Sequence, residues 1–330
     1  MKAAVLKGVN ELVVDTVPQP EVRPGEVLVR LQAAALNHRD VWIKTGQYAG
    51  LHFPIIPGSD GAGTVVEVGP GVDASWMEQE VIINPSFDWG HGERAQEPRF
   101  TILGLPHDGT LAEYIRVPAT QLAPKPTHLG WEEAAALPLV GLTAFRALFR
   151  RAQLQAHEKV LITGIGAGTA LMALQFATAA GAIPCVTSSS PAKLEKAHEL
   201  GAKAGALYNM PDWHVEFGRH HGPFDVIVDS AAGSGFEHLI DLAATGGRIV
   251  FFGATRGNPP ELPMRKLFWR QISLLGTTMG SPADFAAMVE FVKTHALRPV
   301  VSETFALDQV GEAFQRMERG EQFGKLVVRL

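Results

Sequence analysis

The stretch Val160-Leu-Ile-Thr-Gly164-Ile-Gly166-Ala-Gly168-Thr-Ala170 carries the strongest local signal in the sequence. An apolar strand runs into three glycines at alternate positions, and an apolar helix, Leu171 to Ala179, follows at once. Glycines let a pyrophosphate approach the backbone, and free N–H groups at the helix start bind it. The spacing is G-x-G-x-G-x-A rather than G-x-G-x-x-G, because Thr169 stands where the last glycine belongs. A tight strand-to-helix turn without a ligand is the alternative interpretation.

Six short apolar strands are predicted around and after this turn, with helical patterns between most of them. One of these helices is bracketed by Ser190 as its cap, Pro191 in its first turn and Gly201 after its end. Alternating strands and helices build a parallel sheet through right-handed crossovers, and six strands make a doubly wound Rossmann domain. We place this α/β domain at residues 125–278. Its strands are predicted at 160–163, 184–187, 206–208, 226–229, 248–252 and 272–275.

The first 124 residues follow a different pattern of short β-rich runs, with Pro and Gly at nearly every junction. They predict an irregular antiparallel sheet or barrel with one helix at 38–45 and a long surface loop at 84–104. A helix at 309–319 and a strand at 326–329 are expected to return to this domain. Residues 279–330 therefore complete it.

The composition fits a soluble globular protein of two domains. Of the 330 residues, 46% are apolar and 19% charged, and the net charge is −5. No basic stripe exists for a nucleic-acid backbone, and no stretch approaches the ~20 apolar residues of a membrane span. Cys185 is the only cysteine, which excludes an internal disulfide and a thiolate-rich zinc site. We expect a cytoplasmic protein whose partner is a small molecule, not a nucleic acid or a membrane.

The residues after the second strand indicate which dinucleotide is bound. A site for the unphosphorylated cofactor places Asp or Glu there to bond the ribose hydroxyls. Here the sequence is Ser188-Ser-Ser-Pro-Ala-Lys193, whose hydroxyl and ammonium groups suit a 2′-phosphate. This favours NADP(H) over NAD(H). The alternative is that Ser190 only caps a helix and that Lys193 is solvated.

Several segments together resemble the medium-chain dehydrogenase/reductase superfamily, over essentially the whole chain. Within it, the sequence is most similar to quinone oxidoreductases and to relatives labelled alcohol dehydrogenase-like. The resemblance implies a GroES-like catalytic domain beside the Rossmann domain. The segments that carry it are Ala35-Leu-Asn-His-Arg-Asp40, Pro57-Gly-Ser-Asp-Gly-Ala-Gly63, Gly109-Thr-Leu-Ala-Glu-Tyr114, Gly141-Leu-Thr-Ala144 and Gly324-Lys-Leu-Val-Val328.

The resemblance also implies the contacts of the cofactor. Ser188, Lys193 and Tyr208 are expected around the 2′-phosphate, and Lys325 near the pyrophosphate. The remaining expected contacts lie along the adenosine, the ribose, the pyrophosphate and the nicotinamide; they are Thr143, Gly164, Gly166, Gly168, Ala170, Ser189, Ser230, Phe252 and Gly253.

The zinc-binding branch of this superfamily needs ligands that the sequence lacks. Asn37, Ser59 and Leu139 stand where that branch has its catalytic zinc ligands, and none of them replaces a thiolate or an imidazole. The lobe 84–104, which in that branch holds four cysteines, has none. Scattered candidates such as His91, Glu93 and the His220-His221 pair do not form a ligand pattern. We therefore expect a metal-free enzyme.

The candidate catalytic residues also follow from the resemblance. Asn37 and Thr143 are expected to face the nicotinamide, and Tyr48 to lie at the substrate cleft. Trp42 stands where enoyl-reducing relatives carry a tyrosine proton donor, and an indole is no useful acid. His38 is therefore the nearest candidate for proton relay, with a purely structural role as the alternative.

Two further carboxylates, Asp40 and Asp60, are candidates for a buried acid pair in the cleft. Helix capping, or an ion pair with Arg39 or Lys44, is the more usual fate of such residues.

Three functions remain open at this point. The first is an NADPH-dependent, zinc-independent oxidoreductase that transfers hydride to quinones or activated enones. The second is an alcohol or aldehyde dehydrogenase-like oxidoreductase, and the third is a non-catalytic NADPH-binding sensor. The last strand of the sheet, at 272–275, exposes an edge, and the resemblance implies a homodimer paired there, with a tetramer as an alternative.

Overall fold

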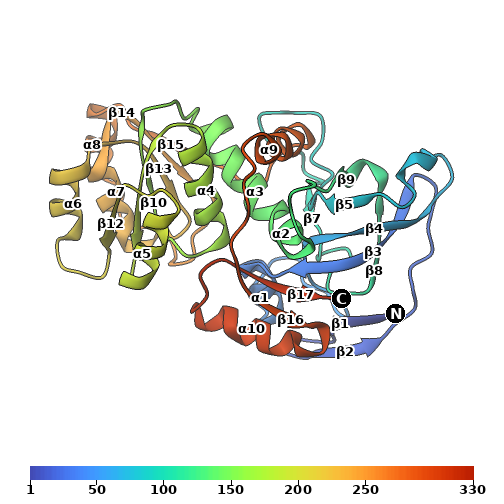
Figure 1. Ribbon diagram of the computed structural model, residues 1–330. Coiled ribbons are helices and arrows are strands. Elements are labelled where there is room, and N and C mark those ends of the chain that lie inside the picture. The colour runs from blue at the N-terminus through green and yellow to red at the C-terminus, as the bar shows by residue number, and fades with distance from the viewer. The chain divides into compact units, whose positions relative to one another are not determined.

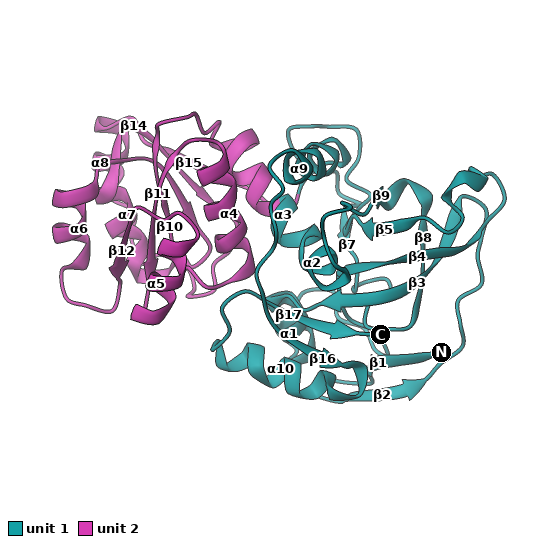
Figure 2. Cartoon of the chain, viewed as in Figure 1, with its two compact units in different colours: residues 1–142, 280–330 teal, residues 143–279 magenta.

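The computed structural model describes all 330 residues as two compact units (Figure 2). Unit 1 contains residues 1–142 and 280–330, and unit 2 contains residues 143–279. Residues 125–142, which the sequence pattern assigned to the Rossmann domain, thus belong to unit 1. The reason is packing, because helix α2 (Trp131–Ala136) makes its contacts with strands β3 (Glu26–Ala35), β4 (Asp60–Val68) and β17 (Lys325–Arg329) of unit 1.

Unit 2 is built on a six-stranded, fully parallel sheet in the order β12-β11-β10-β13-β14-β15. This order confirms the predicted doubly wound Rossmann domain. Each predicted strand is present with bounds shifted by a few residues; the largest change is at β14, which begins five residues early. The strands are β10 (Lys159–Ile162), β11 (Ile183–Ser188), β12 (Ala204–Leu207), β13 (Phe224–Asp229), β14 (Ala243–Phe251) and β15 (Ser273–Gly276).

Helices cover both faces of this sheet (Figure 1). Two of them pack on strands β10 to β12, and the other three contact one another on the opposite face, as right-handed crossovers on either side of β10 require. Ser190 caps the second helix as predicted, accepting from the backbone N–H of Lys193. The helices are α4 (Gly168–Ala179), α5 (Pro191–Glu199), α6 (Trp213–His221), α7 (Phe236–Leu242) and α8 (Met264–Trp269).

Unit 1 is β-rich and irregular, which confirms the predicted second architecture. Its main sheet has the order β16-β17-β3-β4-β5-β9, with β8 paired to β3. The pairs are antiparallel except for β16 and β17. Two smaller hairpins, β1-β2 and β6-β7, complete it. The further strands are β1 (Lys2–Leu6), β2 (Leu12–Thr16), β5 (Glu80–Ile83), β6 (Ser86–Phe87), β7 (Thr101–Ile102), β8 (Tyr114–Pro118), β9 (Leu122–Pro124) and β16 (Val301–Ala306).

The C-terminal segment returns to unit 1 as predicted. Strand β17 inserts between β16 and β3, and helix α10 (Val310–Arg319) packs on β16, β17 and α1 (His38–Lys44). The apolar side chains of α10, among them Phe314 and Met317, are buried in one core with residues of β1 and β3. Helix α9 (Pro282–Thr294) leads back from unit 2, and helix α3 (Pro138–Phe145) carries the other crossing. No helix has both the length and the apolarity to span a lipid bilayer.

Candidate active site

Three candidate site residues of unit 1 lie where three neighbouring strands of its sheet end or begin. Asn37 follows the end of β3, Asp60 opens β4, and Lys325 opens β17. Because β3 runs antiparallel to both neighbours, with Ala35 opposite Asp60 and opposite Val327, these three residues share one end of the sheet. The register therefore brings together residues that are up to 288 positions apart in the sequence.

Lys325, Asp60 and Asn37 form a closed polar cluster in the interior of unit 1. The Lys325 ammonium donates to Asn37 Oδ1 (2.7 Å) and to Asp60 Oδ2 (2.8 Å). Asn37 Nδ2 donates to the same carboxylate oxygen at 2.9 Å, and the backbone N–H of Leu139 reaches Oδ1 at 2.8 Å. Lys325 and Asn37 are 3% and 6% exposed, and Asp60 is inaccessible. A buried carboxylate is stable only when it is paired and bonded in this way.

This placement changes what the sequence suggested about two of these residues. The Asp60 carboxylate pairs with Lys325 rather than with Asp40, Arg39 or Lys44, and Lys44 pairs instead with Glu318. Lys325 was predicted near the pyrophosphate. In the structure its ammonium is bonded within unit 1, and the contact with a cofactor stays a prediction.

Arg39 fixes the neighbouring residue Ser59. Its guanidinium donates to Ser59 Oγ at 2.7 Å and to the backbone oxygen of Leu103 at 2.6 Å, while Ser59 Oγ donates to the same oxygen at 2.8 Å. The guanidinium also lies 5.0 Å from the ring centre of Tyr48, another predicted cleft residue. Ser59 is thus held by a buried hydrogen-bond network that uses its hydroxyl.

Two titratable residues of helix α1 have shifted pKa values. Asp40 caps the helix by accepting from the backbone N–H of Asn37, and its other carboxylate oxygen has no partner. Burial raises the pKa of Asp40. The His38 ring centre lies 6.4 Å from that of Trp42, and desolvation by the surrounding protein, followed by the charge of Lys325, lowers the pKa of His38. At neutral pH His38 is therefore mainly a neutral imidazole.

The residues at the three expected zinc positions do not fit a zinc ion. Asn37 and Leu139 both bond to Asp60 through N–H groups, which are not metal donors, and the Ser59 hydroxyl is engaged with Arg39 and Leu103. The nearest charged donor, Asp60, is already paired with an ammonium group. Zinc requires thiolate, imidazole or carboxylate ligands free to bind it. No cluster of three His, Cys, Asp or Glu side chains with metal-site geometry occurs in the chain.

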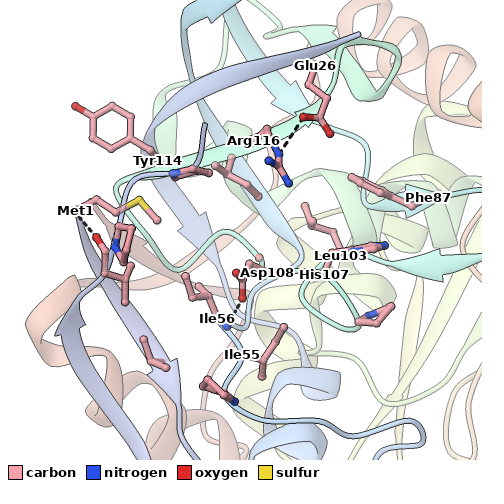
Figure 3. A pocket seen from close by; sticks show the side chains of 18 of the residues that line it. Met1, Glu26, Ile55, Ile56, Phe87, Leu103, His107, Asp108, Tyr114 and Arg116 are labelled. Atoms are coloured by element: carbon pink, nitrogen blue, oxygen red, sulfur yellow. Dashed lines mark hydrogen bonds and ion pairs between the residues drawn. The ribbon is translucent and has the colours of Figure 1, made fainter. Parts of the chain in front are cut away.

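A cavity of about 680 Å³ opens on unit 1, and its lining includes Leu103, whose backbone oxygen accepts from Arg39 and Ser59 (Figure 3). Leu103 and Ile56 line it, and so does Asp108, which accepts from the backbone N–H of Ile56 at 2.9 Å. The Arg116–Glu26 ion pair, 3.0 Å, stands on another wall. None of the predicted catalytic residues lines this cavity.

The glycine-rich turn of unit 2 has the backbone that a bound pyrophosphate needs. Gly164 and Gly166 have φ values of +64° and +121°, which favour glycine. A Cβ on Gly164 would meet no atom within 4 Å, so the turn is open above it. Gly168 begins helix α4, and the residue before it, Ala167, gives no side-chain cap, which leaves the first N–H groups of the helix for an anion. Ala170 is buried beneath.

Polar and cationic groups gather at the carboxyl end of β11. Ser188 is buried and accepts from the backbone N–H of Ser190 at 3.1 Å, whereas Ser189 is exposed. The Lys193 side chain lies over the glycine turn, because a Cβ on Gly166 would be 2.8 Å from its Cδ and 3.4 Å from its Nζ. Tyr208 joins them through its backbone N–H, which donates to Ser188 at 3.0 Å. The predicted 2′-phosphate residues are therefore neighbours.

The loops after β13 and β14 lie against each other at the carboxyl end of the same sheet. The backbone oxygen of Ser230 accepts from Thr255 at 3.3 Å, and a Cβ on Gly253 would be 2.8 Å from that oxygen. Phe252 donates its backbone N–H to Asp229 at 3.1 Å. These close approaches bring the two loops, predicted to follow the ribose, into contact with each other.

Three residues of this region were missed by the sequence interpretation. Thr163 donates its hydroxyl to Asp229 at 2.6 Å, and the same carboxylate accepts from the backbone N–H groups of residues 231 and 232. Arg256 reaches across to Tyr208, 5.6 Å from its ring centre. Thr163 and Asp229 are the last residues of two predicted strands. Polar residues at these positions were the signal in the sequence that could have identified them. Nothing in the sequence near Arg256 indicates its contact.

Thr143 and Cys185 are both buried in unit 2. Thr143 lies on helix α3, four residues after Leu139. Its hydroxyl is 3.8 Å from the sulfur of Met279. Burial raises the pKa of the Cys185 thiol to about 11, which agrees with an unreactive core residue.

Comparison with known proteins identifies the family. Residues 23–127 match the family described as alcohol dehydrogenase GroES-like domain, and residues 168–294 match the family described as zinc-binding dehydrogenase. A zinc-type alcohol dehydrogenase-like protein of Leptosphaeria maculans is 37% identical over 97% of this chain and 94% of its own. The crotonyl-CoA reductase of Streptomyces collinus is 30% identical over 95% of this chain and 80% of its own.

A solved structure agrees over the whole length. The crystal structure of a protein named NAD-dependent alcohol dehydrogenase superposes with a TM-score of 0.94 and 39% identity, covering 100% of both chains. Together with the parallel six-stranded sheet and the GroES-like unit, these relatives show that the chain belongs to the medium-chain dehydrogenase/reductase superfamily of oxidoreductases.

Proposed function

We propose that this oxidoreductase is an NADPH-dependent, zinc-independent reductase of activated enones, with quinones as further acceptors. The observation that carries the proposal is the buried cluster of Lys325, Asp60 and Asn37, in which Asn37, at a position where the resemblance implies a zinc ligand, is bonded to an ammonium and a carboxylate group. Without a Lewis acid to polarise a carbonyl, the site suits acceptors that take hydride readily. NADPH, when bound, supplies that hydride.

Asn37 is the group best arranged to stabilise the resulting oxyanion. Lys325 donates to its Oδ1, which fixes the orientation of the amide, and one hydrogen of Nδ2 goes to Asp60. The second hydrogen of Nδ2 then points in a fixed direction and can donate to a substrate oxygen. Preorganised N–H donors of this kind are a main source of catalysis in reactions that develop oxyanions. Thr143 is the proposed second contact, on the side of the cofactor.

The proton that completes reduction of an enone needs a separate source. Trp42 lacks an acidic proton, and the lowered pKa of His38 leaves only a small protonated fraction at neutral pH. Proton transfer through His38, resupplied from solvent, would be faster in mildly acidic buffer. Tyr48 is held by Arg39 and is proposed to shape the cleft.

Two features of the sequence and structure support the choice of NADPH. The carboxyl end of β11 carries hydroxyls and the Lys193 ammonium, and no carboxylate of the kind that bonds ribose hydroxyls follows that strand. The solved relative is named as NAD-dependent, which favours NADH over NADPH. Comparing the two cofactors directly therefore belongs to the first experiment.

The names of the relatives support different substrate classes. A protein named crotonyl-CoA reductase acts on an α,β-unsaturated thioester, which favours enones and enoyl thioesters over quinones. The solved relative, named as an alcohol dehydrogenase, favours the second candidate, an alcohol dehydrogenase. The residues at the zinc positions argue against that candidate for this chain.

Initial rates under anaerobic conditions test the proposal. We expect chelator-resistant oxidation of NADPH with a simple enone, a short enoyl thioester or a simple quinone, and slower oxidation of NADH. Turnover of ethanol that depends on added zinc would establish the alcohol dehydrogenase instead. Tight NADPH binding with no acceptor reduced would leave the non-catalytic sensor as the function.

We also propose a homodimer through the edge of the unit 2 sheet. Strand β15 has only β14 as a partner, and the preceding helix α8 exposes Met264, Phe268 and Trp269 at 64%, 66% and 81%. An apolar patch beside an open sheet edge suits pairing with a second copy. Light scattering at micromolar concentration should give twice the mass of the chain, and Trp269→Glu should give monomers. Met210→Glu, at another exposed apolar residue of unit 2, is the control and should stay dimeric.

The proposed compartment is the cytoplasm. The chain has one cysteine, and its thiol is buried with a pKa raised to about 11, so the fold uses no disulfide. Such cysteine use suits a reducing compartment. Immunofluorescence of the tagged full-length chain would test it.

A further inference from the structure

The loop after β14 lies at the carboxyl end of the unit 2 sheet, on the same edge as the glycine-rich turn. It is anchored on the loop after β13, because Arg256 donates its backbone N–H to residue 231 at 2.9 Å and Gly233 donates to Gly257 at 2.8 Å. From this anchor the Arg256 side chain extends to Tyr208, which follows β12. In the sheet order β12-β11-β10-β13-β14, strands β11, β10 and β13 lie between the strands that these two residues follow. The contact thus joins two loops that follow strands on either side of β10, the strand that carries the glycine turn.

The contact at the far side leaves the charge of Arg256 uncompensated. The guanidinium carbon lies 5.6 Å from the ring centre of Tyr208, a cation–π distance, and no ion pair engages Arg256. At an exposed site such a contact contributes only about 0.5–1 kcal/mol. The guanidinium is therefore held only weakly by the Tyr208 ring. It can leave this ring and bind a group that interacts with it more strongly.

The surroundings indicate that this partner is an anion. Lys193 lies over Gly166, and the hydroxyls of Ser188 and Ser189 follow the same strand end. The carboxylate of Asp229 is buried and bonded to Thr163 and to two backbone N–H groups, so it offers Arg256 no free acceptor. A guanidinium presents parallel N–H donors that match two phosphate oxygens.

We propose that Arg256 is a specificity-determining residue for the phosphorylated dinucleotide, binding the 2′-phosphate of the adenosine ribose from the side opposite Lys193. Tyr208 holds the guanidinium through the cation–π contact until the phosphate binds. This inference rests on the proposed NADPH preference and adds to it a residue from the far loop. Specificity then depends on two cations from two loops rather than on the end of β11 alone.

Binding of two cofactor fragments by calorimetry separates the phosphate from the rest of the nucleotide. Adenosine 2′,5′-bisphosphate carries the 2′-phosphate, and adenosine 5′-monophosphate lacks it. We expect Arg256→Ala in the full-length protein to weaken the bisphosphate about tenfold while the monophosphate changes less than about twofold, as loss of one charge-assisted contact predicts. Arg256→Lys should retain part of the difference because it keeps the charge but not the fork.

A matched control and the wild-type protein make each outcome decisive. Arg219→Ala, at an exposed arginine of α6, removes the same charge from the same unit and should leave both affinities unchanged. Equal weakening of both fragments by Arg256→Ala would mean that Arg256 contacts a group that both share, such as the 5′-phosphate or adenine, and an unchanged bisphosphate affinity would mean no contact; either overturns the inference. A wild-type protein that binds both fragments equally would instead refute the proposed NADPH preference.

Discussion

The ammonium nitrogen of Lys325 lies 2.8 Å from Oδ2 of Asp60, and the two side chains are only 4% and 0% exposed. Asn37 Nδ2 and the backbone N–H of Leu139 complete the hydrogen bonds of the carboxylate. A charge pair removed from water loses hydration of several kcal/mol per ion, which only close pairing and further hydrogen bonds offset. The cluster therefore depends on every member being present.

Lys325→Met should destabilise the protein strongly, because it leaves the Asp60 carboxylate buried without its cation. We expect the free energy of unfolding in urea to fall by about 3–5 kcal/mol. Lys2→Met is the control: its pair with Asp308 is exposed on both sides, and its loss should cost less than ~1 kcal/mol. A loss for Lys325→Met as small as that of the control would show that the buried pair does not stabilise the fold. The double variant with Asp60→Asn should lose less than the sum of the single losses.

His38 should titrate below its ordinary pKa of 6.5, since the protein around its ring and the charge of Lys325 both favour the neutral form. The unfolded chain then binds the proton more tightly than the folded one. The stabilising contribution of neutral His38 is therefore complete above pH 6.5 and is lost as the pH falls from 6.5 through the folded midpoint. An NMR titration of the imidazole should give a midpoint below 6.5, and Lys325→Arg should keep it there. A midpoint above 6.5 would contradict the assigned environment.

The fold could be predicted because its signals are local. The strand at 160–163, the glycines behind it and the bracketed helix after Ser190 each follow from patterns within about 15 residues, and the structure places all of them as expected. The predicted domain boundary at residue 124 differs from that of the observed units, in which the first segment of unit 1 extends to residue 142. Helix α2 looks like any other helix in the sequence, and only its packing on β3 and β4 assigns it to unit 1.

The site was predictable only as a set of residue types. Asn37 was predicted as a site residue because its segment resembles the superfamily. The same resemblance showed that the residues at the zinc positions are not zinc ligands. That Lys325 bonds to it across 288 positions depends on the register of β17 against β3, which no local pattern specifies. Arg256 was missed for the same reason, because its contact with Tyr208 joins loops that follow β14 and β12, with three strands between them, and no local pattern specifies it.

Ala232 offers a test of backbone strain in the loop after β13. It has φ 52° and ψ −126°, a region that a residue with a Cβ rarely adopts, and the bond from its N–H to Asp229 (2.7 Å) holds it there. Ala232→Gly should raise the free energy of unfolding by about 1 kcal/mol, since relief of strain exceeds the entropy cost of glycine. Ala231→Gly, at the preceding residue without positive φ, should lower it by ~0.5–1 kcal/mol. Chemical denaturation measures the free energy of unfolding of both variants. An equal decrease in both would show that Ala232 is not strained.

Asn37→Ala tests the proposed oxyanion donor. Removing one preorganised donor should lower kcat for enone reduction about 100-fold, because the lost hydrogen bond is strongest in the transition state. The affinity for NADPH should change little. Asn84→Ala is a matched control, since Asn84 is also a buried asparagine of unit 1 but its side chain bonds only to the backbone of Ser86, and its kcat should stay within about twofold of wild type. Thermal unfolding of both variants separates a loss of structure from a loss of chemistry. If Asn37→Ala reduces the enone at the wild-type rate, the oxyanion is stabilised by another group, and the Lys325–Asp60–Asn37 cluster has a structural role only.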